Sequence, residues 1–286
     1  LNLMKAIVFG GAGFLGSTLN HFLEIQKIES HIFDNFSVGK KEFLENKFQF
    51  FDGDILDKDK ISYYLKKINP DIVIHLAAIH HIPTAESDPC NTLKINLDGT
   101  CNILDILEKR NFSGKFGFAS TGGIYSDLDS KALEESDKID PIGIYTLSKF
   151  YCEKTIEYYK TKRSCNFKPT NFRLFNLVGK NETNDHLLPA ILNQLLKGNK
   201  IHHGNLLPKR DYIHVNDASS LIAKWASSKE IATPYSLNIC SNKQYSVLDV
   251  INICSEITKI RCDLIKDIKR VRKSDRLNQK GDLSLA

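Results

Sequence analysis

In the first half of the chain, short runs of apolar, β-branched and aromatic residues alternate with stretches in which apolar residues recur at helical spacing. The apolar runs predict strands at residues 5–9, 31–34, 49–52, 72–76, 115–120 and 171–175. The helical spacing predicts helices from residue 13, from residue 57, at 92–110 and at 145–160. Strands with helices on both faces are buried and parallel. The pattern therefore predicts a doubly wound parallel α/β sheet over residues 1–176.

Beyond Asn176 the pattern changes to short helices mixed with isolated strands. Helices are predicted at 187–196, 215–227 and 247–258, and strands near residue 201, at 235–239 and at 263–266. We expect residues 177–286 to form mainly a smaller mixed α/β lobe at the carboxyl edge of the sheet. Because ligands of open α/β sheets bind at that edge, the lobe is expected to bind the substrate.

The composition is that of an ordinary globular protein, with 42% hydrophobic and 26% charged residues among 286. The seven cysteines include no C-x-x-C pair, and their odd number argues against a full disulfide framework. We therefore expect reduced thiols, a cytoplasmic location and no metal site. No apolar run approaches ~18 residues, so no membrane span is predicted.

The net charge is +5, and a group of basic residues lies near the end of the chain. Such a group binds phosphate or nucleic acid, or forms a solvated face. Because no aromatic-interleaved basic module accompanies it, nucleic-acid binding is not expected. The group consists of Lys266, Lys269, Arg270, Arg272, Lys273 and Arg276.

A glycine-rich turn joins the first predicted strand to the first helix. Gly10, Gly13 and Gly16 permit a tight turn, the approach of a pyrophosphate to the backbone amides, and close packing of the helix on the strand. Asp34 ends the next predicted strand, where a carboxylate accepts hydrogen bonds from ribose hydroxyls and repels a 2′-phosphate. The turn and Asp34 together predict binding of NAD rather than NADP.

Tyr145 and Lys149 lie four residues apart in a predicted helix, so that the phenol and the ammonium share one face. A nearby positive charge favours the phenolate. Lowering a tyrosine pKa by ~3 units requires about 4 kcal/mol, which Lys149 and the positive charge of a cofactor could supply together. The pair is therefore a candidate proton-transfer device, although a surface pair at helical spacing gives the same pattern.

Taken together, these motifs resemble the extended short-chain dehydrogenase/reductase family, and within it the NAD-dependent epimerase/dehydratase group typified by UDP-glucose 4-epimerase. The resemblance runs from about residue 5 to residue 282. Beyond the glycine turn it rests on Asp34-Asn35-Phe36, Gly53-Asp54-Ile55, His75-Leu76-Ala77-Ala78, Ser87-Asp88-Pro89, Asn96-Leu97-Asp98-Gly99-Thr100, Ser120-Thr121-Gly122-Gly123-Ile124-Tyr125, Tyr145-x-x-x-Lys149, Arg173-Leu174-Phe175-Asn176, Arg210-Asp211-Tyr212-Ile213-His214-Val215 and Arg272-Lys273-Ser274-Asp275.

The resemblance implies a Rossmann-like NAD-binding unit that carries the catalytic residues Thr121, Tyr145 and Lys149. Thr121 would hold a sugar hydroxyl's proton between the substrate and Tyr145, and Lys149 would lower the Tyr145 pKa and hydrogen-bond the nicotinamide ribose. The cofactor residues implied are Gly10, Gly13, Phe14, Leu15, Gly16, Asp34, Asn35, Asp54, Ile55, Leu76, Ala77, Ala78, Asn96, Ser120, Tyr145, Lys149 and Phe175.

For the substrate, the resemblance implies a nucleotide-diphosphate sugar, with a UDP-sugar favoured. Arg210 and Arg272 match the diphosphate-contacting arginines, since guanidinium suits phosphate oxygens. Gln279 falls where the family limits the substituent at C2 of the sugar. The remaining substrate positions implied are Thr121, Asn176, His186, Leu187, Ile201 and His203.

The two positions after Thr121 distinguish the 4,6-dehydratases from the 4-epimerases of the group. The 4,6-dehydratases carry an Asp-Glu pair after the position of Thr121, where this chain has Gly122 and Gly123. The resemblance therefore favours a 4-epimerase that works through a transient 4-keto sugar. A 4-keto-sugar reductase that uses NAD(P)H remains the alternative, and a non-catalytic dinucleotide-sensing scaffold a remoter one.

The resemblance also implies a homodimer in which helices 92–110 and 145–160 pair as a four-helix bundle. The family normally continues through a final helix beyond the position of Ala286, which the smaller lobe of this chain is expected to lack. The chain departs from the family at His80-His81-Ile82-Pro83, which replaces the usual residues after the Ala-Ala pair. This change could reshape the nicotinamide or sugar pocket.

Overall fold

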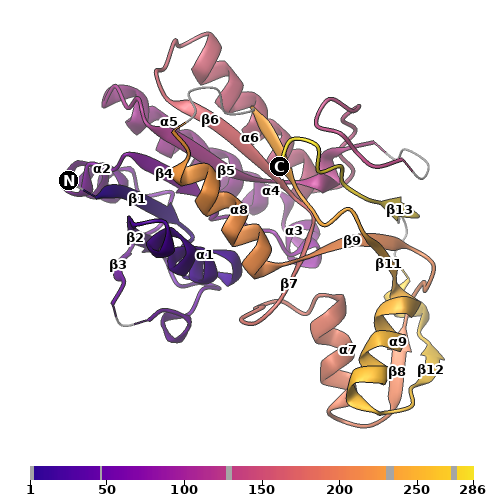
Figure 1. The fold of residues 1–286 in the computed structure, drawn as a ribbon. Coiled ribbons are helices and arrows are strands. Elements are labelled where there is room, and N and C mark those ends of the chain that lie inside the picture. Colours follow the sequence, from indigo (N-terminus) through magenta and orange to yellow (C-terminus); the bar gives the residue numbers. More distant parts are fainter. Residues whose placement is uncertain (1–2, 46, 127–130, 230–234, 272–275) are drawn as a thin grey trace.

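The computed structural model describes residues 3–45, 47–126, 131–229, 235–271 and 276–286. Its centre is a seven-stranded sheet in the order β10-β6-β5-β4-β1-β2-β3, and every neighbouring pair is parallel (Figure 1). The predicted doubly wound sheet is thus confirmed. The strands are β1 (Met4–Phe9), β2 (Ile28–Asp34), β3 (Gln49–Asp52), β4 (Ile72–His75), β5 (Lys115–Thr121), β6 (Lys168–Leu174) and β10 (Ser236–Ile239).

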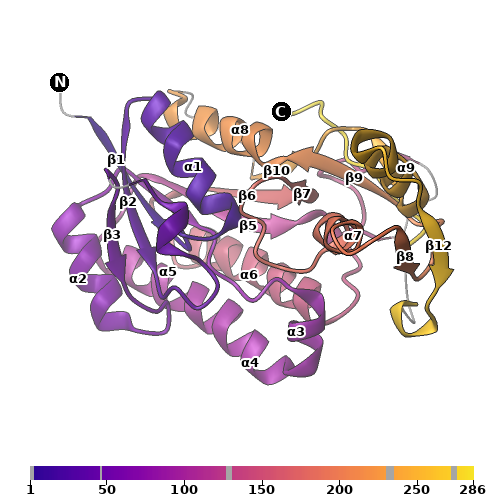
Figure 2. The same ribbon diagram turned by 90° about the horizontal axis from the view of Figure 1, so that it is seen from below.

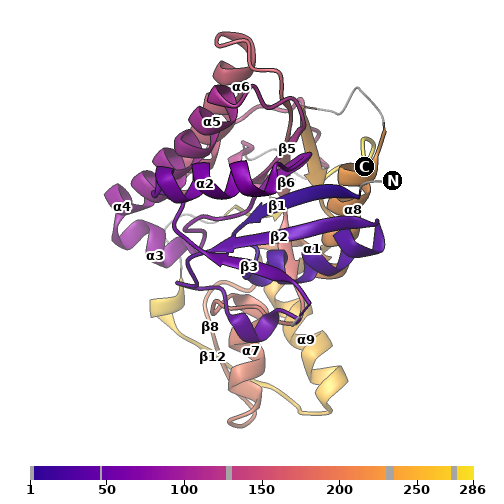
Figure 3. The ribbon, with the colours of Figure 1, turned by 90° about the vertical axis from the view of Figure 1, so that its left-hand side faces the viewer.

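Helices cover both faces of this sheet, as the continuous apolar strands require (Figures 2 and 3). On one face α1 (Phe14–Ile25) packs against α8 (Val215–Ser227), and their apolar side chains form one core with those of β1 and β4. On the other face α2 (Lys58–Ile68), α5 (Gly99–Lys109) and α6 (Ile144–Thr161) form a second core. The sheet is therefore buried between two layers of helices.

The predicted helix at 92–110 is longer than expected and is interrupted. It begins with α4 (Pro89–Leu93), passes through a π-helical turn, η2 (Lys94–Asp98), and continues as α5. The short helix α3 (Ile82–Ser87) precedes it. Single π turns inside helices often mark functional sites, and here the turn contains Asn96.

The smaller lobe lies below the large sheet in the view of Figure 3. It has its own core, formed chiefly between α7 (Leu187–Leu195) and α9 (Val247–Thr258). In the lobe β9 is paired by β7, β11 and β13, and a separate parallel pair joins β8 to β12. These strands are β7 (Asn176–Val178), β8 (Lys200–His203), β9 (Lys209–His214), β11 (Gln244–Ser246), β12 (Asp263–Lys266) and β13 (Asn278–Gln279).

Residues after 176 do not all belong to this lobe. The predicted helix 215–227 is α8, which packs on α1, and the predicted strand 235–239 is β10, which extends the large sheet beside β6. Both were expected in the smaller lobe. The reason is burial, because α8 carries Ile222 and Trp225 and β10 carries Ile239 into the core of the large unit. The chain therefore crosses between the two units more than once.

Candidate active site

The three predicted catalytic residues lie at the carboxyl end of β5 and in the first turns of α6. Thr121 is the last residue of β5, and Tyr145 is the second residue of α6. The Thr121 hydroxyl lies close enough to the Tyr145 phenol to act on its pKa. Lys149 follows one turn later on α6, and its Nζ lies 4.8 Å from the centre of the Phe118 ring on β5. The strand end and the helix start thus bring hydroxyl, phenol and ammonium into one region.

The pKa of Tyr145 differs from the sequence-based expectation. Burial raises it to about 12, although the Thr121 hydroxyl acts to lower it. Lys149 was expected to lower it but has no resolved effect, because burial lowers the pKa of this lysine itself to about 8. The protein residues alone therefore keep Tyr145 protonated near neutrality, and a further positive charge is needed to make it a base.

Thr121 has two structural tasks. Its Oγ1 accepts a hydrogen bond from the Gly123 backbone N–H at 3.1 Å, so the residue caps the short 3₁₀ turn that follows β5. The same side chain meets Tyr145. A hydroxyl has two acceptor lone pairs and one donor hydrogen, so the cap leaves the hydrogen for another partner. The capping role and the proposed relay are therefore compatible.

A buried polar network supports the end of β5, and the sequence patterns did not reveal it. Arg173 on β6 donates from Nε and Nη2 to Glu153 on α6 at 3.1 and 2.9 Å. Ser120 donates to the same carboxylate at 2.5 Å, and Arg173 also reaches the Tyr125 hydroxyl at 2.9 Å. Ser120 was predicted to contact the cofactor, but it is 1% exposed and its hydroxyl is committed to Glu153. Its role here is to hold β5 against α6.

The glycine turn has the geometry that its sequence predicts. Gly10 has φ +79°, and a Cβ on it would meet the Ala77 backbone nitrogen at 2.6 Å. Gly13 is the N-cap of α1, whose first-turn amides lack intrahelical partners. Asp34 accepts hydrogen bonds from the Ala12 and Phe36 amides at 2.9 and 2.8 Å, which ties the turn to the end of β2. The arrangement is an anion-binding helix start beside a carboxylate.

The other predicted residues around this turn fall into two groups. Asn35 donates to Asp54 at 2.8 Å, so these two polar side chains share one location. Phe14, Leu15 and Ile55 are between 5% and 8% exposed and pack into the two cores, so only their backbones can face a cofactor.

The loop after β4 is held by Asn96 in the π turn. Asn96 exchanges two hydrogen bonds with the Ile79 backbone, at 2.8 and 3.0 Å, and donates to Ser148 of α6 at 2.9 Å. Leu76 and Ala77 continue from β4 by donating their amides to the Phe9 carbonyl, and Ala78 follows. Asn96 was predicted to contact the cofactor, whereas its side chain braces the loop that carries Leu76, Ala77 and Ala78.

Three of the residues predicted to bind the substrate lie on β9 and on the two strands β7 and β13 that pair with it. Asn176 on β7 donates to the Asp211 carbonyl at 3.0 Å, and Gln279 on β13 pairs in register with Arg210. Arg210 Nη1 donates to the carbonyls of Lys209 and Arg276. Arg272 lies outside the described residues. The structure thus brings Asn176, Arg210 and Gln279 to one small sheet.

The remaining predicted residues are spread over the smaller lobe. Ile201 is 1% exposed in the core of the lobe, so its side chain cannot face a ligand as predicted. His203 hydrogen-bonds the Gly204 carbonyl at 2.9 Å. His186 is the N-cap of α7, and Leu187 packs against the lobe core. Phe175 is 5% exposed and belongs to a separate buried cluster with Tyr125 and Cys240, so it too is a core residue.

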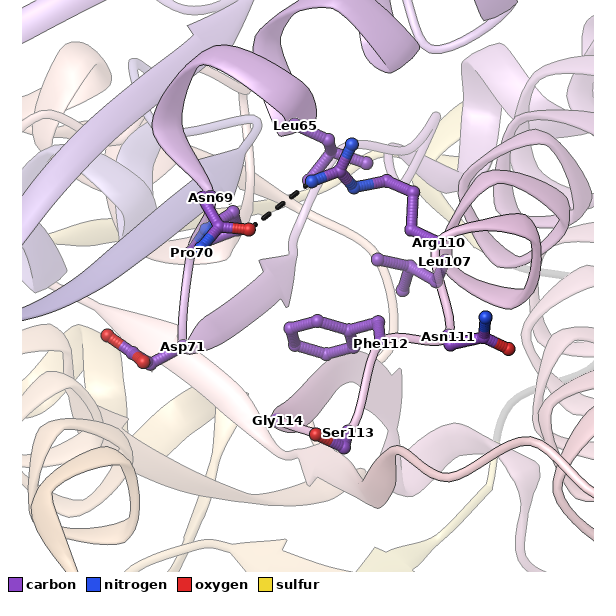
Figure 4. A pocket seen from close by; sticks show the side chains of 10 residues that line it. All are labelled: Leu65, Asn69, Pro70, Asp71, Leu107, Arg110, Asn111, Phe112, Ser113 and Gly114. Carbon is purple, nitrogen blue, oxygen red and sulfur yellow. Dashed lines mark hydrogen bonds between the residues drawn. The ribbon is translucent and has the colours of Figure 1, made fainter.

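A pocket of about 310 Å³ lies away from these residues (Figure 4). Asp71 and Gly114 line it, and they immediately precede β4 and β5. Arg110 donates to the Asn69 side chain across it at 3.3 Å. This pocket opens at the amino ends of the strands, whereas the catalytic residues lie at the carboxyl ends. It is therefore not the candidate active site.

Residues 6–240 match the model of the NAD dependent epimerase/dehydratase family. The chain belongs to this family. GDP-6-deoxy-D-talose 4-dehydrogenase of Aggregatibacter actinomycetemcomitans is 30% identical to it over 98% of this chain and 89% of the relative. GDP-6-deoxy-D-mannose reductase of Pseudomonas aeruginosa is 27% identical over 80% and 76%. The crystal structure of UDP-glucose 4-epimerase from Thermotoga maritima with UDP-glucose is 26% identical, with a TM-score of 0.87 over 98% of this chain and 90% of that one.

As a member of this family of nucleotide-sugar enzymes, the protein has NAD as its cofactor. The residues fit the dinucleotide. The Gly13 helix start leaves amides for the pyrophosphate, and Asp34 lies at the end of the next strand for a ribose. Lys149 is only 3% exposed, and among the described residues it forms no ion pair with a carboxylate. A buried ammonium of this kind suits ribose hydroxyls. Among the helices described, none is long and apolar enough to cross a bilayer.

Proposed function

We propose that the protein is an NAD-dependent nucleotide-sugar 4-epimerase of the UDP-hexose or UDP-N-acetylhexosamine class. The observation that carries this proposal is the surroundings of Thr121. A Cβ at Gly122 would meet the Phe175 ring at 2.8 Å, and one at Gly123 would meet Thr146 at 3.0 Å. There is thus little room beside Thr121 for the carboxylates that a 4,6-dehydratase carries. The site keeps the tyrosine, the threonine and the lysine, which are sufficient for epimerisation.

The roles of the three residues follow from their geometry. NAD, when bound, supplies the hydride acceptor and a positive charge near the phenol. Tyr145 would then take the proton of the sugar 4-hydroxyl, with Thr121 between them as a relay. Lys149 would hold the ribose, and the positive charge of bound NAD would favour the phenolate. After the 4-keto sugar has turned over, Tyr145 would return this proton to the C4 oxygen.

Arg210 and Gln279 supply the proposed contacts to the rest of the substrate. They are paired neighbours on β9 and β13, in the small sheet that begins directly after the end of β6. Arg210 provides a guanidinium suited to a diphosphate. Asn176, at the junction of β6 and β7, lies between this sheet and the end of the large one. The structure of the Thermotoga maritima relative with UDP-glucose supports a UDP-sugar.

A 4-keto-sugar reductase is the second candidate, and two of the relatives support it. The relatives described above are a GDP-6-deoxy-sugar 4-dehydrogenase and a GDP-6-deoxy-sugar reductase. Such an enzyme would use the same three residues in one direction only, and it would consume one reduced cofactor for each sugar. Asp34 favours NADH over NADPH in that reaction as well.

Cofactor balance separates the two candidates. Purified protein is incubated with UDP-glucose or UDP-N-acetylglucosamine and NAD, and the sugars are followed by NMR; we expect the 4-epimer to form with no net change in NADH. In parallel, a GDP-4-keto-6-deoxyhexose is supplied with NADH. Stoichiometric NADH oxidation there, with no interconversion of any UDP-sugar by NAD-loaded protein, would replace the epimerase by the reductase.

We also propose that the protein is a homodimer through α4, α5 and α6. Two tyrosines of α6, Tyr151 and Tyr158, are 46% and 52% exposed and lie seven residues apart, on one face of the helix. Exposed aromatic side chains grouped in this way are typical of protein interfaces.

A further inference from the structure

Three side chains with metal-binding atoms meet beside the loop after β4. They are His80, Glu182 and His186, and one ligand atom from each lies within 4.8 Å of the others. His80 follows the Ala77-Ala78 pair, whereas Glu182 and His186 lie in the segment between β7 and α7. The three residues come from distant parts of the chain, so no sequence spacing announces them, and the sequence predicted no metal site.

Hydrogen bonds orient two of these residues toward a common point. The Asn184 side-chain amide donates to His80 Nε2 at 3.0 Å, so this nitrogen presents its lone pair. The Asn184 backbone N–H donates to Glu182 Oε1 at 3.0 Å. Two N–H groups of Asn184 thus donate to the ligand atoms of His80 and Glu182, in the place of a cation.

We propose that His80, Glu182 and His186 bind a divalent transition metal ion of the Zn²⁺ class. Two imidazoles and one carboxylate form a donor set that such ions use, with a further coordination position left for water or another oxygen ligand. At Zn–N distances near 2.0 Å, ligand atoms on one tetrahedral ion lie about 3.3 Å apart, so the cluster must contract by up to ~1.5 Å. The Asn184 amide must leave His80 in the same step.

The metal would join the large unit, which carries the candidate catalytic residues, to the smaller lobe, which carries residues predicted to bind the substrate. His80 belongs to the loop that Asn96 braces against Ser148 of the catalytic helix. His186 is the N-cap of α7, the first helix of the smaller lobe. A bound ion would tie the loop to the entrance of that lobe. Its effects would therefore include higher resistance to unfolding, which can be measured without any assay of activity.

Metal binding is tested on the full chain, with any affinity tag removed and the protein freed of metal by chelation. Zn²⁺ is titrated by calorimetry, and Co²⁺ is used as a spectroscopic probe of coordination. We expect one ion per chain, a visible Co²⁺ spectrum typical of nitrogen and oxygen ligands, and a rise in melting temperature with Zn²⁺. The variants His186→Ala and Glu182→Gln should each weaken binding by at least ~10-fold and remove the rise.

His202→Ala is the matched control, because it removes an exposed imidazole of β8 that lies outside the cluster. It should bind Zn²⁺ as the unmodified chain does. Far-ultraviolet circular dichroism in the presence of chelator shows whether each variant is folded. If His186→Ala does not fold, Glu182→Gln still provides the test, because glutamine keeps an oxygen that can accept the hydrogen bond from the Asn184 backbone N–H. The proposal is overturned if the unmodified chain binds no Zn²⁺ up to roughly 100 μM, or if both cluster variants bind it as well as His202→Ala.

Discussion

Lys149 is a buried cation, and its surroundings disfavour the positive charge. It is 3% exposed, faces the Phe118 ring, and carries a pKa lowered to about 8 by burial. A charge that is buried without an opposite partner costs stability. Such a cost is kept where the group has a chemical task, and the task proposed above for Lys149 is to hold the ribose of the cofactor. Catalytic residues are therefore expected to lower the stability of the protein that carries them.

Replacing Lys149 by Met should stabilise the cofactor-free protein while abolishing turnover. Lowering the pKa from 10.5 to about 8 corresponds to roughly 3 kcal/mol below pH 8. Loss of the cation–π contact with Phe118 reduces the expected gain to roughly 1 to 3 kcal/mol. Because the folded state releases this proton first, the unmodified protein gains stability as the pH rises from about 8 to 10.5.

The advantage of Lys149→Met should therefore shrink over that range. Urea unfolding at about pH 7 and about pH 9.5 measures it. Lys154→Met, on the same helix but 57% exposed in its side chain, is the control and should be nearly neutral at both pH values. A stability gain that is independent of pH would show that the lysine charge is not its cause.

Replacing Tyr145 by Phe should remove the acid–base group and leave the fold intact. Turnover should fall by ~10²-fold or more, because phenylalanine has no hydroxyl that could take up and return the proton. The NAD dissociation constant should change by less than about threefold, since the ring remains. Tyr151→Phe, on the exposed face of the same helix, should behave as the unmodified enzyme. Equal activity of the two variants would refute the role of Tyr145.

At the scale of the element, the turn between β1 and α1 combines two kinds of glycine. Gly10 is required by the fold, because its φ is +79° and the Ala77 backbone leaves no room for a side chain. Gly13 has φ −75°, and the nearest atom to a Cβ on it would be the Gly10 carbonyl oxygen at 3.3 Å. A Cβ at position 13 would need a shift of only a few tenths of an ångström, so the fold requires glycine there less strictly than at position 10. We propose that a ligand approaching the helix start is the further reason for glycine at position 13.

Gly13→Ala and Gly10→Ala should thus fail in different ways. Gly13→Ala should keep the melting temperature within a few degrees and weaken NAD binding by ~10-fold or more. Gly10→Ala should lower stability by more than about 1 kcal/mol, because alanine is strained at this φ and collides with the loop after β4. Thermal melting and NAD calorimetry measure both effects. Unchanged NAD affinity in Gly13→Ala would place the pyrophosphate elsewhere.

At the scale of the whole molecule, the two helical layers have unequal outer surfaces. The layer that contains α6 exposes Tyr151 and Tyr158, two large aromatic side chains in line along one helix. Tyr145, the proposed acid–base group, lies near the start of the same helix. An interface on this face would steady the helix that carries the phenol and the ammonium.

Tyr158→Lys should therefore disrupt the proposed dimer. Size-exclusion chromatography with light scattering is expected to give twice the chain mass for the unmodified protein and a concentration-dependent or monomeric mass for the variant. Tyr63→Lys is the control, since Tyr63 is 60% exposed on α2, which is not one of the helices of the proposed interface. If the unmodified protein has the mass of one chain at micromolar concentration, the proposed dimer is wrong.

The sequence by itself determined the elements that depend on neighbours in the chain. Strands β1 to β6, the glycine turn, Asp34 at a strand end and the spacing of Tyr145 and Lys149 are all local patterns, because periodicity and backbone preference act over a few residues. Element bounds differ from the predictions by a few residues. β9 was missed, since its Lys-Arg-Asp-Tyr-Ile-His run lacks the apolar alternation of a strand although Asp211 within it is fully buried.

Only the tertiary structure decided which residues of distant segments come into contact. It joined β10 to the large sheet, turned Ser120 and Asn96 inward as braces, and buried Ile201 in the lobe core. It also raised the Tyr145 pKa, because burial depends on everything packed around the phenol. The cluster of His80, Glu182 and His186 exists for the same reason. Contacts between residues far apart in the chain leave no periodic signal, so they emerge only when the fold brings those residues together.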